Sequence, residues 1–150
     1  MRRMIVLGFA SLLACAPPGR RVLVHDELVP VDVLLREHPL GPATNIRADE
    51  IERTRGASTH LVQIRGSESP HRHVAHDLVV AIVVGQGELS VNGVRHALGA
   101  GDVAVVPRGA SHWFVRRGDT PAVAVVTFAP PLDAPDSVPD PHVDSAAGDR

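Results

Sequence analysis

Three histidines and an aspartate lie within seven residues of this chain, in the run His71-Arg-His73-Val-Ala-His76-Asp77. Successive side chains of an extended strand point to opposite faces, so His71 and His73 are expected to project from the same face. Two imidazole nitrogens would then converge without help from the rest of the fold. Because imidazole nitrogens and carboxylate oxygens bind divalent transition metals, the run predicts part of a metal site.

A further nitrogen donor is expected downstream at His112, which follows the turn residues Pro107 and Gly109. His112 belongs to a different segment from His71 and His73, so the fold has to bring it to them. Asp77 and His76 are both candidates for a fourth ligand. The turn between their strands interrupts the alternation of faces, so strand parity does not choose between them.

Short strands are the elements that would position these residues. Glycine and proline mark the corners, and the expected strands are residues 59–65, 71–73, 78–84, 88–91, 103–106, 112–115 and 122–128. Residues 78–84 are all apolar, which predicts a strand covered on both faces. Asn92-Gly93 is a strong hairpin signal. Strands of this spacing predict an all-β sandwich or barrel.

These residues resemble the two motifs of a known family, the cupins, whose small members are single double-stranded β-helix barrels of jelly-roll type. The second motif, G-x5-P-x-G-x2-H-x3-N, is matched by Gly101, Pro107, Gly109 and His112, with Arg116 in place of the final asparagine. The first motif, G-x5-H-x-H-x3/4-E-x6-G, is matched by His71, His73 and Gly85, while Gly66 is one residue too close. The resemblance implies a cupin jelly roll.

The acid of the first motif departs from the family pattern. Asp77 stands at the three-residue spacing, whereas counting back from Gly85 places the family's glutamate at Leu78. The resemblance implies that His71, His73 and His112 bind one divalent metal (Mn, Fe, Ni, Cu or Zn) inside the barrel. Asp77 would supply the carboxylate, with His76 as the alternative ligand. The competing interpretation is a barrel without metal, whose loop histidines are simply exposed.

Two residues on the strand that starts at His112 are candidates for binding a ligand. Residues 112, 114 and 116 share a face, so Phe114 and Arg116 would point into the same cavity as His112. A guanidinium beside a metal favours an anionic ligand such as a small carboxylate. The alternative is that Arg116 begins a turn and extends into water.

The N-terminus has a basic start followed by a short apolar core, which predicts a signal peptide over residues 1–14. Leu12-Leu13-Ala14-Cys15 resembles the bacterial lipobox, so Cys15 is the expected lipidation site and residues 15–21 the tether. Ordinary cleavage after Ala16 is the alternative. We therefore expect an exported protein that is lipid-anchored to the cell envelope, on the periplasmic side of a membrane. As Cys15 is the only cysteine, no disulfide framework is expected.

The rest of the 150 residues has room for one domain, expected at 22–130 with its motif core at 59–128. A short helix at 31–38 and a strand at 46–54 would precede that core. Residues 131–150, rich in proline, aspartate, serine and alanine, are expected to be a disordered tail. The formal charge is −2 and the chain has no lysine, so no basic field for nucleic acid is present.

Two functions fit these features. The first is a metal-binding module of the envelope that holds a small molecule. The alternative is a metal-dependent enzyme of dioxygenase or isomerase type, acting on a small organic acid or sugar-like substrate. A homodimer is a further expectation.

Overall fold

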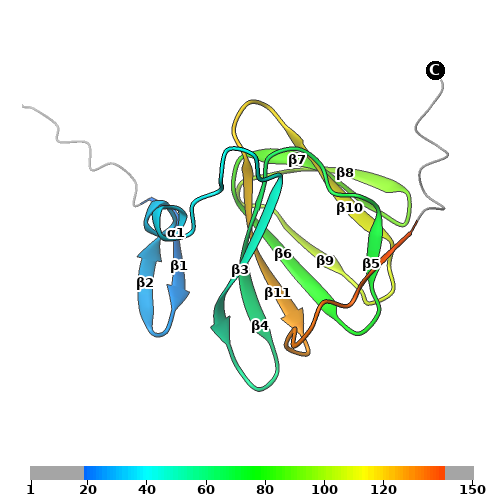
Figure 1. Ribbon diagram of the computed structural model, residues 1–150, viewed down its shortest axis with the longest axis horizontal. Coiled ribbons are helices and arrows are strands. Elements are labelled where there is room, and N and C mark those ends of the chain that lie inside the picture. The colour runs from blue at the N-terminus through cyan, green and yellow to red at the C-terminus, as the bar shows by residue number, and fades with distance from the viewer. Residues whose placement is uncertain (1–18, 141–150) are drawn as a thin grey trace, which may run out of the picture.

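The structure, a computed structural model, describes residues 19–140. The predicted signal peptide, Cys15 and the last ten residues of the predicted tail lie outside this part of the chain. Figure 1 shows the elements within it: β1 (Arg21–Val24), β2 (Glu27–Pro30), α1 (Val31–Glu37), β3 (Ile46–Arg53), β4 (Ser58–Ile64), β5 (His71–His73), β6 (Asp77–Val84), β7 (Gln86–Val91), β8 (Val94–Gly99), β9 (Val103–Val106), β10 (His112–Arg117), β11 (Ala122–Ala129) and β12 (Ser137–Pro139).

Two five-stranded antiparallel sheets face each other and enclose the interior of the barrel. One has the order β12-β5-β10-β7-β8 and the other β3-β4-β11-β6-β9. Neighbours in a sheet are often distant in the chain, as in a jelly roll: β10, for example, pairs with both β5 and β7. The all-β barrel expected from the sequence is confirmed, and the predicted strands agree closely with those observed.

Glycines are needed at two particular positions of this fold, one in a turn and one within a strand. Asn92 and Gly93 both have positive φ, 49° and 82°, and form the two-residue turn between β7 and β8, as the Asn-Gly signal predicts. Gly87 is required for packing instead, because a Cβ at this position would overlap the ring of Phe114. The bare backbone of β7 therefore lets Phe114 lie inside the barrel.

The main core fills the space between the sheets. Its buried members come from six strands and a loop: Ile64, Leu78, Ile82, Leu89, Val106, Ala110, Phe114, Ala122, Ala124, Val126 and Phe128. Val106 is fully buried and Phe114 is 4% exposed. Alternation along each strand places these side chains inward, so the wall of the barrel is largely apolar.

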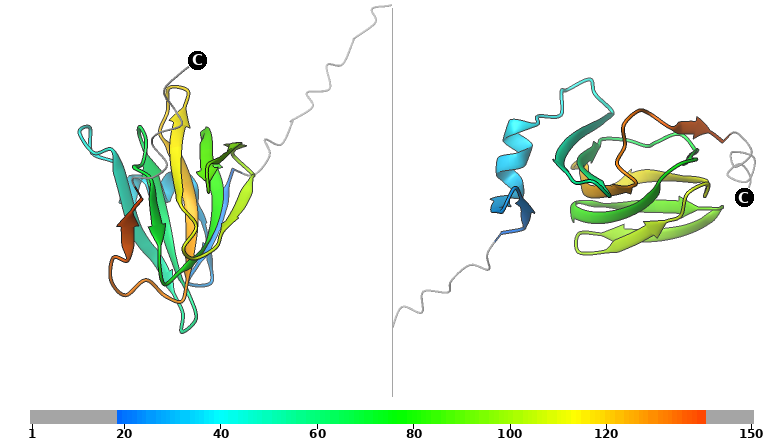
Figure 2. Two further views of the ribbon diagram at one scale, coloured as in Figure 1. Left: turned by 90° about the vertical axis from the view of Figure 1, so that its right-hand side faces the viewer. Right: turned by 90° about the horizontal axis from the view of Figure 1, so that it is seen from below.

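A second core lies on the outer face of the β3-containing sheet. Leu34 of α1 packs there with Ile51, Leu61 and Val123, and the β1–β2 hairpin adds Val22 and Val24. Figure 2 shows this hairpin and helix on one flank of the barrel. The cover is partial, because Val79 and its neighbour Val105 are 43% and 65% exposed. The prediction that β6 is covered on both faces is therefore wrong for its first part. Within residues 19–140 no helix is long and apolar enough to cross a membrane.

Residues 130–140, here called the C-terminal strap, differ from the disorder expected from their composition. They leave β11, run past the end of the barrel and form β12 beside β5 (Figure 1). Leu132 explains part of the order: its N–H donates to Ser58 Oγ at 2.9 Å, and its carbonyl accepts from Arg53 Nη2 at 2.9 Å. The composition of the C-terminal residues could not predict these partners, because the partners lie about 75 residues earlier in the chain.

Candidate metal centre

Three histidines converge at one end of the barrel interior. His71 and His73 project from β5, and His112 is the first residue of β10, where it pairs directly with His71. Their ligand atoms all lie within 4.8 Å of one another. The ring centroids of His71 and His112 are 4.4 Å apart, and those of His73 and His112 are 5.4 Å apart. His71 and His73 lie together because alternate residues of a strand share a face, and the pairing of β10 with β5 brings His112 to them.

Each of these imidazoles has its Nδ1 atom beside an oxygen acceptor. His71 Nδ1 lies 2.8 Å from the Ser69 carbonyl, His112 Nδ1 lies 3.0 Å from the Ala110 carbonyl, and His73 Nδ1 lies 2.6 Å from Asp136 Oδ1. Because these oxygens can only accept, the proton belongs on Nδ1 in all three rings. The Nε2 lone pairs are then left as ligands, which is how metal-binding histidines are usually held.

Burial favours the neutral form of two of these rings. Desolvation, with smaller contributions from the nearby His71 and His73, lowers the pKa of His112 to about 4, although the hydrogen bond to the Ala110 carbonyl acts in the opposite direction. Desolvation also lowers the pKa of His73, partly offset by Asp136. A metal binds only the neutral imidazole, so both residues are ready for ligation at pH 7.

Asp136 on the C-terminal strap was not predicted as part of the site. Burial alone would raise its pKa, but hydrogen bonds from His76, His73 and the Ala75 amide outweigh burial and lower the pKa to about 2. Asp136 is therefore an anion that contacts the outer nitrogen of His73. Nothing in the sequence near Asp136 links it to a histidine 63 residues earlier.

The histidines open onto a cavity of about 80 Å³ between the two sheets. Its wall is mostly apolar and includes Leu78, Ile82, Leu89, Phe114, Val126 and Phe128. This volume holds several water molecules or one small ligand, because one water needs roughly 10–15 Å³ by the same measure.

Glu68 lines the same cavity, and the sequence interpretation overlooked it. The residue as a whole is partly exposed, but its carboxyl group is desolvated, which raises its pKa, while His71 acts to lower it. Glu68 Oε2 accepts a hydrogen bond from the Phe114 amide at 2.9 Å. Because Glu68 precedes the histidines, the family pattern, which places an acid after them, gives no signal for it.

The structure does not bring Asp77 to the three histidines. Asp77 Oδ2 lies 2.7 Å from Arg108 Nη2, and Oδ1 accepts the Arg108 amide at 2.9 Å. Its side chain is 46% exposed, and the hydrogen bonds from Arg108 lower its pKa. The carboxylate expected at the metal is thus held at the surface by an arginine.

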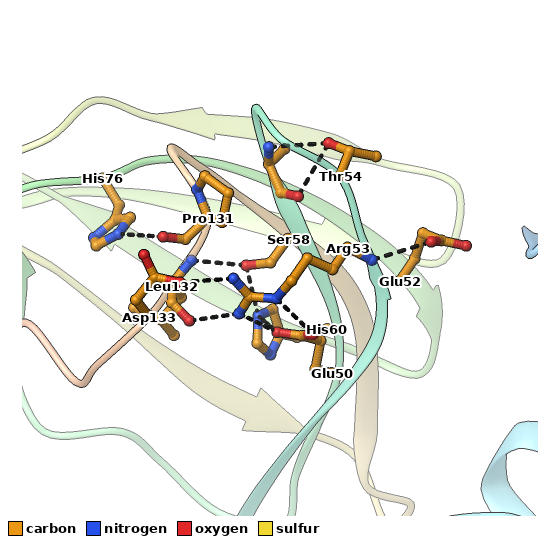
Figure 3. Close-up of polar contacts among 11 residues, drawn as sticks. Glu50, Glu52, Arg53, Thr54, Ser58, His60, His76, Pro131, Leu132 and Asp133 are labelled. Carbon is orange, nitrogen blue, oxygen red and sulfur yellow. Dashed lines mark hydrogen bonds and ion pairs between the residues drawn. The ribbon is translucent and has the colours of Figure 1, made fainter.

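His76 also lies apart from the three-histidine cluster. Its Nδ1 is 2.6 Å from Asp136 Oδ2, and its Nε2 is 3.3 Å from the Pro131 carbonyl. Figure 3 shows the contact with Pro131. Because both of its ring nitrogens face oxygens of the C-terminal strap, His76 helps to hold the strap against the barrel.

The two residues predicted to bind a ligand have different positions. Phe114 lines the cavity. Arg116 does not, because its Nε donates to the Arg65 carbonyl at 2.6 Å. Arg116 shares a strand face with Phe114, but its hydrogen bond to the Arg65 carbonyl keeps its guanidinium out of the cavity.

The donor set fits a divalent transition metal. Three imidazoles without sulfur suit manganese, iron, nickel, copper or zinc. Three protein ligands facing a cavity also leave coordination positions for water or a ligand, as in catalytic rather than structural sites. The buried histidine cluster is therefore compatible with a metal that remains open to small molecules.

Comparisons with known proteins agree with the fold. Residues 59–128 match the model of the cupin domain. An uncharacterized protein of Aquifex aeolicus (strain VF5) is 36% identical over 112 residues, covering 75% of this chain and 91% of that protein.

Solved structures give the same result. KdgF from Halomonas sp. has a TM-score of 0.59 at 26% identity, covering 65% of this chain and 91% of its own. A variant of Streptomyces PAC13 with uridine has a TM-score of 0.55 at 21% identity, covering 64% of this chain and 78% of its own, and thus shows the fold alone. With its two motifs, its jelly-roll barrel and these matches, the chain belongs to the cupin family.

Proposed function

We propose that this protein binds one divalent transition metal through Nε2 of His71, His73 and His112, and uses it to hold a small molecule in the barrel. One observation carries the proposal: three imidazoles converge while each Nδ1 lies beside its own oxygen acceptor. Histidines that were merely buried polar residues would not need to direct their free nitrogens to a common point. Asp77 and His76 are omitted from this ligand set because each is held by other partners.

The cavity supports a small, largely apolar and neutral ligand. Its wall is hydrocarbon apart from the histidines and Glu68, and none of the described residues that line it is an arginine. An anionic ligand would meet the Glu68 carboxylate without the help expected from Arg116. The wall therefore favours a neutral molecule with one metal-binding group over the organic acid considered from the sequence.

Metal content tests the proposed function. Purified protein is equilibrated with each divalent metal in turn, freed of excess ions and analysed by mass spectrometry for metal per chain. We expect about one metal per wild-type chain and far less in His112→Ala, because the pair on β5 cannot replace a ligand from β10. His96→Ala is the matched control, since His96 is an exposed histidine on β8. Equal metal content in His112→Ala and wild type, with the fold intact by circular dichroism, would exclude this ligand set.

Catalysis is a second candidate function, and Glu68 is the observation that favours it. A divalent metal at this site would supply Lewis acidity. Glu68 is the one acid among the described residues lining the cavity, and its raised pKa suits it to hold or release a proton near the bound molecule. Turnover of small neutral compounds by wild type but not by metal-loaded Glu68→Gln would identify an enzyme; binding without turnover in both would identify a binding module.

The location of the protein is a separate part of the proposal. We propose export and lipid anchoring at Cys15, on the basis of the signal-like residues 1–14 and the lipobox-like ending. In a bacterial host, wild-type protein should incorporate labelled fatty acid and sediment with membranes, whereas Cys15→Ser should do neither. Equal labelling of both proteins would contradict the anchor.

A further inference from the structure

The strand that carries two of the three histidines is held largely by the C-terminal strap. β5 has three residues and pairs with β10 at only one position, His71 opposite His112. On its other side β12 pairs with all three residues, placing Ser137 opposite His73 and Pro139 opposite His71. Figure 2 shows the strap beside β5, on the flank opposite the hairpin and helix. The strap is therefore part of the framework of the site.

Asp136 connects the strap to the histidines themselves. Its Oδ1 is 2.6 Å from His73 Nδ1, while Oδ2 is 2.6 Å from His76 Nδ1 and accepts the Ala75 amide at 3.0 Å. The Asp136 side chain is 12% exposed, and those of His73 and His76 are 11% and 8% exposed. The largely enclosed Asp136 carboxylate thus uses both of its oxygens to bind the segment that contains β5.

Contacts outside the site fix the strap before it reaches Asp136. Arg53 donates to the Leu132 carbonyl and to Asp133 Oδ1, and Ser58 accepts the Leu132 amide (Figure 3). Beyond Asp136, the Asp140 amide donates to the Pro70 carbonyl at 3.0 Å. Because the strap is anchored on both sides of Asp136, contacts outside the three-histidine cluster already hold this carboxylate beside His73.

On the basis of the proposed metal site, we infer that Asp136 is a positioning residue of the metal centre and that metal binding and strap order stabilise each other. Asp136 keeps the proton of His73 on Nδ1 and fixes the ring so that Nε2 faces the other two histidines. Such outer partners change metal affinity without touching the metal. Since coupling between two equilibria is reciprocal, a bound metal must also hold the strap more firmly.

The substitution Asp136→Asn separates this role from simple packing. An amide has the shape of the carboxylate but only one acceptor oxygen, so it cannot accept from both His73 and His76. If its NH₂ group faces His73, the proton moves to Nε2 and that ligand is lost. Asp133→Asn is the control, because Asp133 lies on the same strap, is 86% exposed, and as asparagine keeps an oxygen that can accept from Arg53.

Metal affinity and the absorption spectrum of the cobalt-loaded protein are the measurements. Competition with a chromophoric chelator should show zinc affinity about 10–100-fold weaker in Asp136→Asn than in wild type. The cobalt spectrum should shift in this variant, and Asp133→Asn should match wild type in both respects. Affinity and spectrum of Asp136→Asn equal to those of wild type would overturn the positioning role alone. A wild-type protein that binds neither zinc nor cobalt would instead refute the proposed function on which it rests.

A second measurement uses wild type and does not depend on whether Asp136→Asn folds. Adding zinc should slow hydrogen exchange of the Ala75 amide, which donates to Asp136, more than that of the Asn92 amide, which donates to the Ser111 carbonyl away from the strap. Equal slowing at both positions, or none at Ala75, would show that the metal does not act on the strap.

Discussion

The two carboxylates that flank β5 have opposite environments. Glu68 precedes the strand by three residues and faces the cavity of the three histidines. It accepts a hydrogen bond from the backbone amide of Phe114. Asp77 follows the strand by four residues, lies at the surface, and is paired with Arg108. Burial raises the pKa of Glu68, whereas hydrogen bonds from Arg108 lower that of Asp77.

The difference shows that distance along the chain does not decide which acid reaches a metal site. An arginine with a free guanidinium competes for a nearby carboxylate, and Arg108 offers Asp77 both its side chain and its amide. Among the described residues, Glu68 accepts its hydrogen bond from a neutral amide rather than from an arginine, so its carboxyl group is left facing the cavity. The position that the family pattern assigns to the acid, Leu78, lines the cavity with a hydrocarbon side chain instead.

Placing a carboxylate at Leu78 has the largest effect that we expect. Leu78 is 4% exposed, so in metal-free protein Leu78→Glu should lower the free energy of unfolding by about 3–5 kcal/mol, the cost of a buried charge without a partner. Zinc should restore much of this loss, because the new carboxylate would face the histidines. Denaturation in urea, with and without zinc, measures both effects.

Leu78→Gln is the matched control for this variant. It introduces a polar side chain of the same size without the charge, so it should be destabilised but gain no more from zinc than wild type does. If zinc stabilises Leu78→Glu and Leu78→Gln equally, position 78 does not face the metal.

Removing the charge of Glu68 should have a smaller effect, and this effect should be a loss of zinc affinity. In Glu68→Gln the amide oxygen can still accept from Phe114, but the negative charge beside the cavity is gone. We expect zinc affinity to fall by up to roughly tenfold, or about 1.4 kcal/mol. Glu88→Gln on β7, outside the cavity, is the control, and an unchanged affinity in Glu68→Gln would show that the Glu68 carboxylate does not act on the metal.

Wild type and Glu68→Gln together also test the pKa of Glu68. Because folding raises this pKa, Glu68 stabilises the fold fully below its unfolded value of 4.5, and this contribution is lost as pH rises through the folded value. Metal-free Glu68→Gln should therefore gain stability relative to wild type between pH 4 and pH 8. Wild type and Glu68→Gln share every other titratable group, so the difference between the two proteins reports on Glu68. A difference that is constant with pH would contradict the shift.

The fold could be predicted from the sequence because its signals are local. Alternation and corner residues predicted the strands, and Asn92-Gly93 predicted the hairpin that joins β7 and β8. The C-terminal strap could not be predicted this way. Its order depends on Arg53, Ser58 and the β5 segment, and composition contains no record of such distant partners.

The site divides in the same way. His71 and His73 share a face through strand geometry alone, and the second family motif located His112. Glu68 and Asp136 have no fixed spacing from these histidines, so only the fold reveals them. Arg116 illustrates the converse, since strand parity predicts that it shares a face with Phe114 but could not show that the Arg65 carbonyl holds its side chain.

Removing the charge of Asp77 should have the smallest effect. Asp77→Asn breaks an exposed ion pair with Arg108 but leaves the cavity untouched, so zinc affinity should remain that of wild type. Arg108→Gln, which removes the partner and frees the aspartate, sharpens the test. If Asp77 is kept from the metal only by Arg108, zinc affinity should rise in Arg108→Gln, and the double variant with Asp77→Asn should lose the gain. A marked loss of affinity in Asp77→Asn alone would mean that Asp77 leaves Arg108 for the metal, and that the contrast with Glu68 holds only for the metal-free barrel.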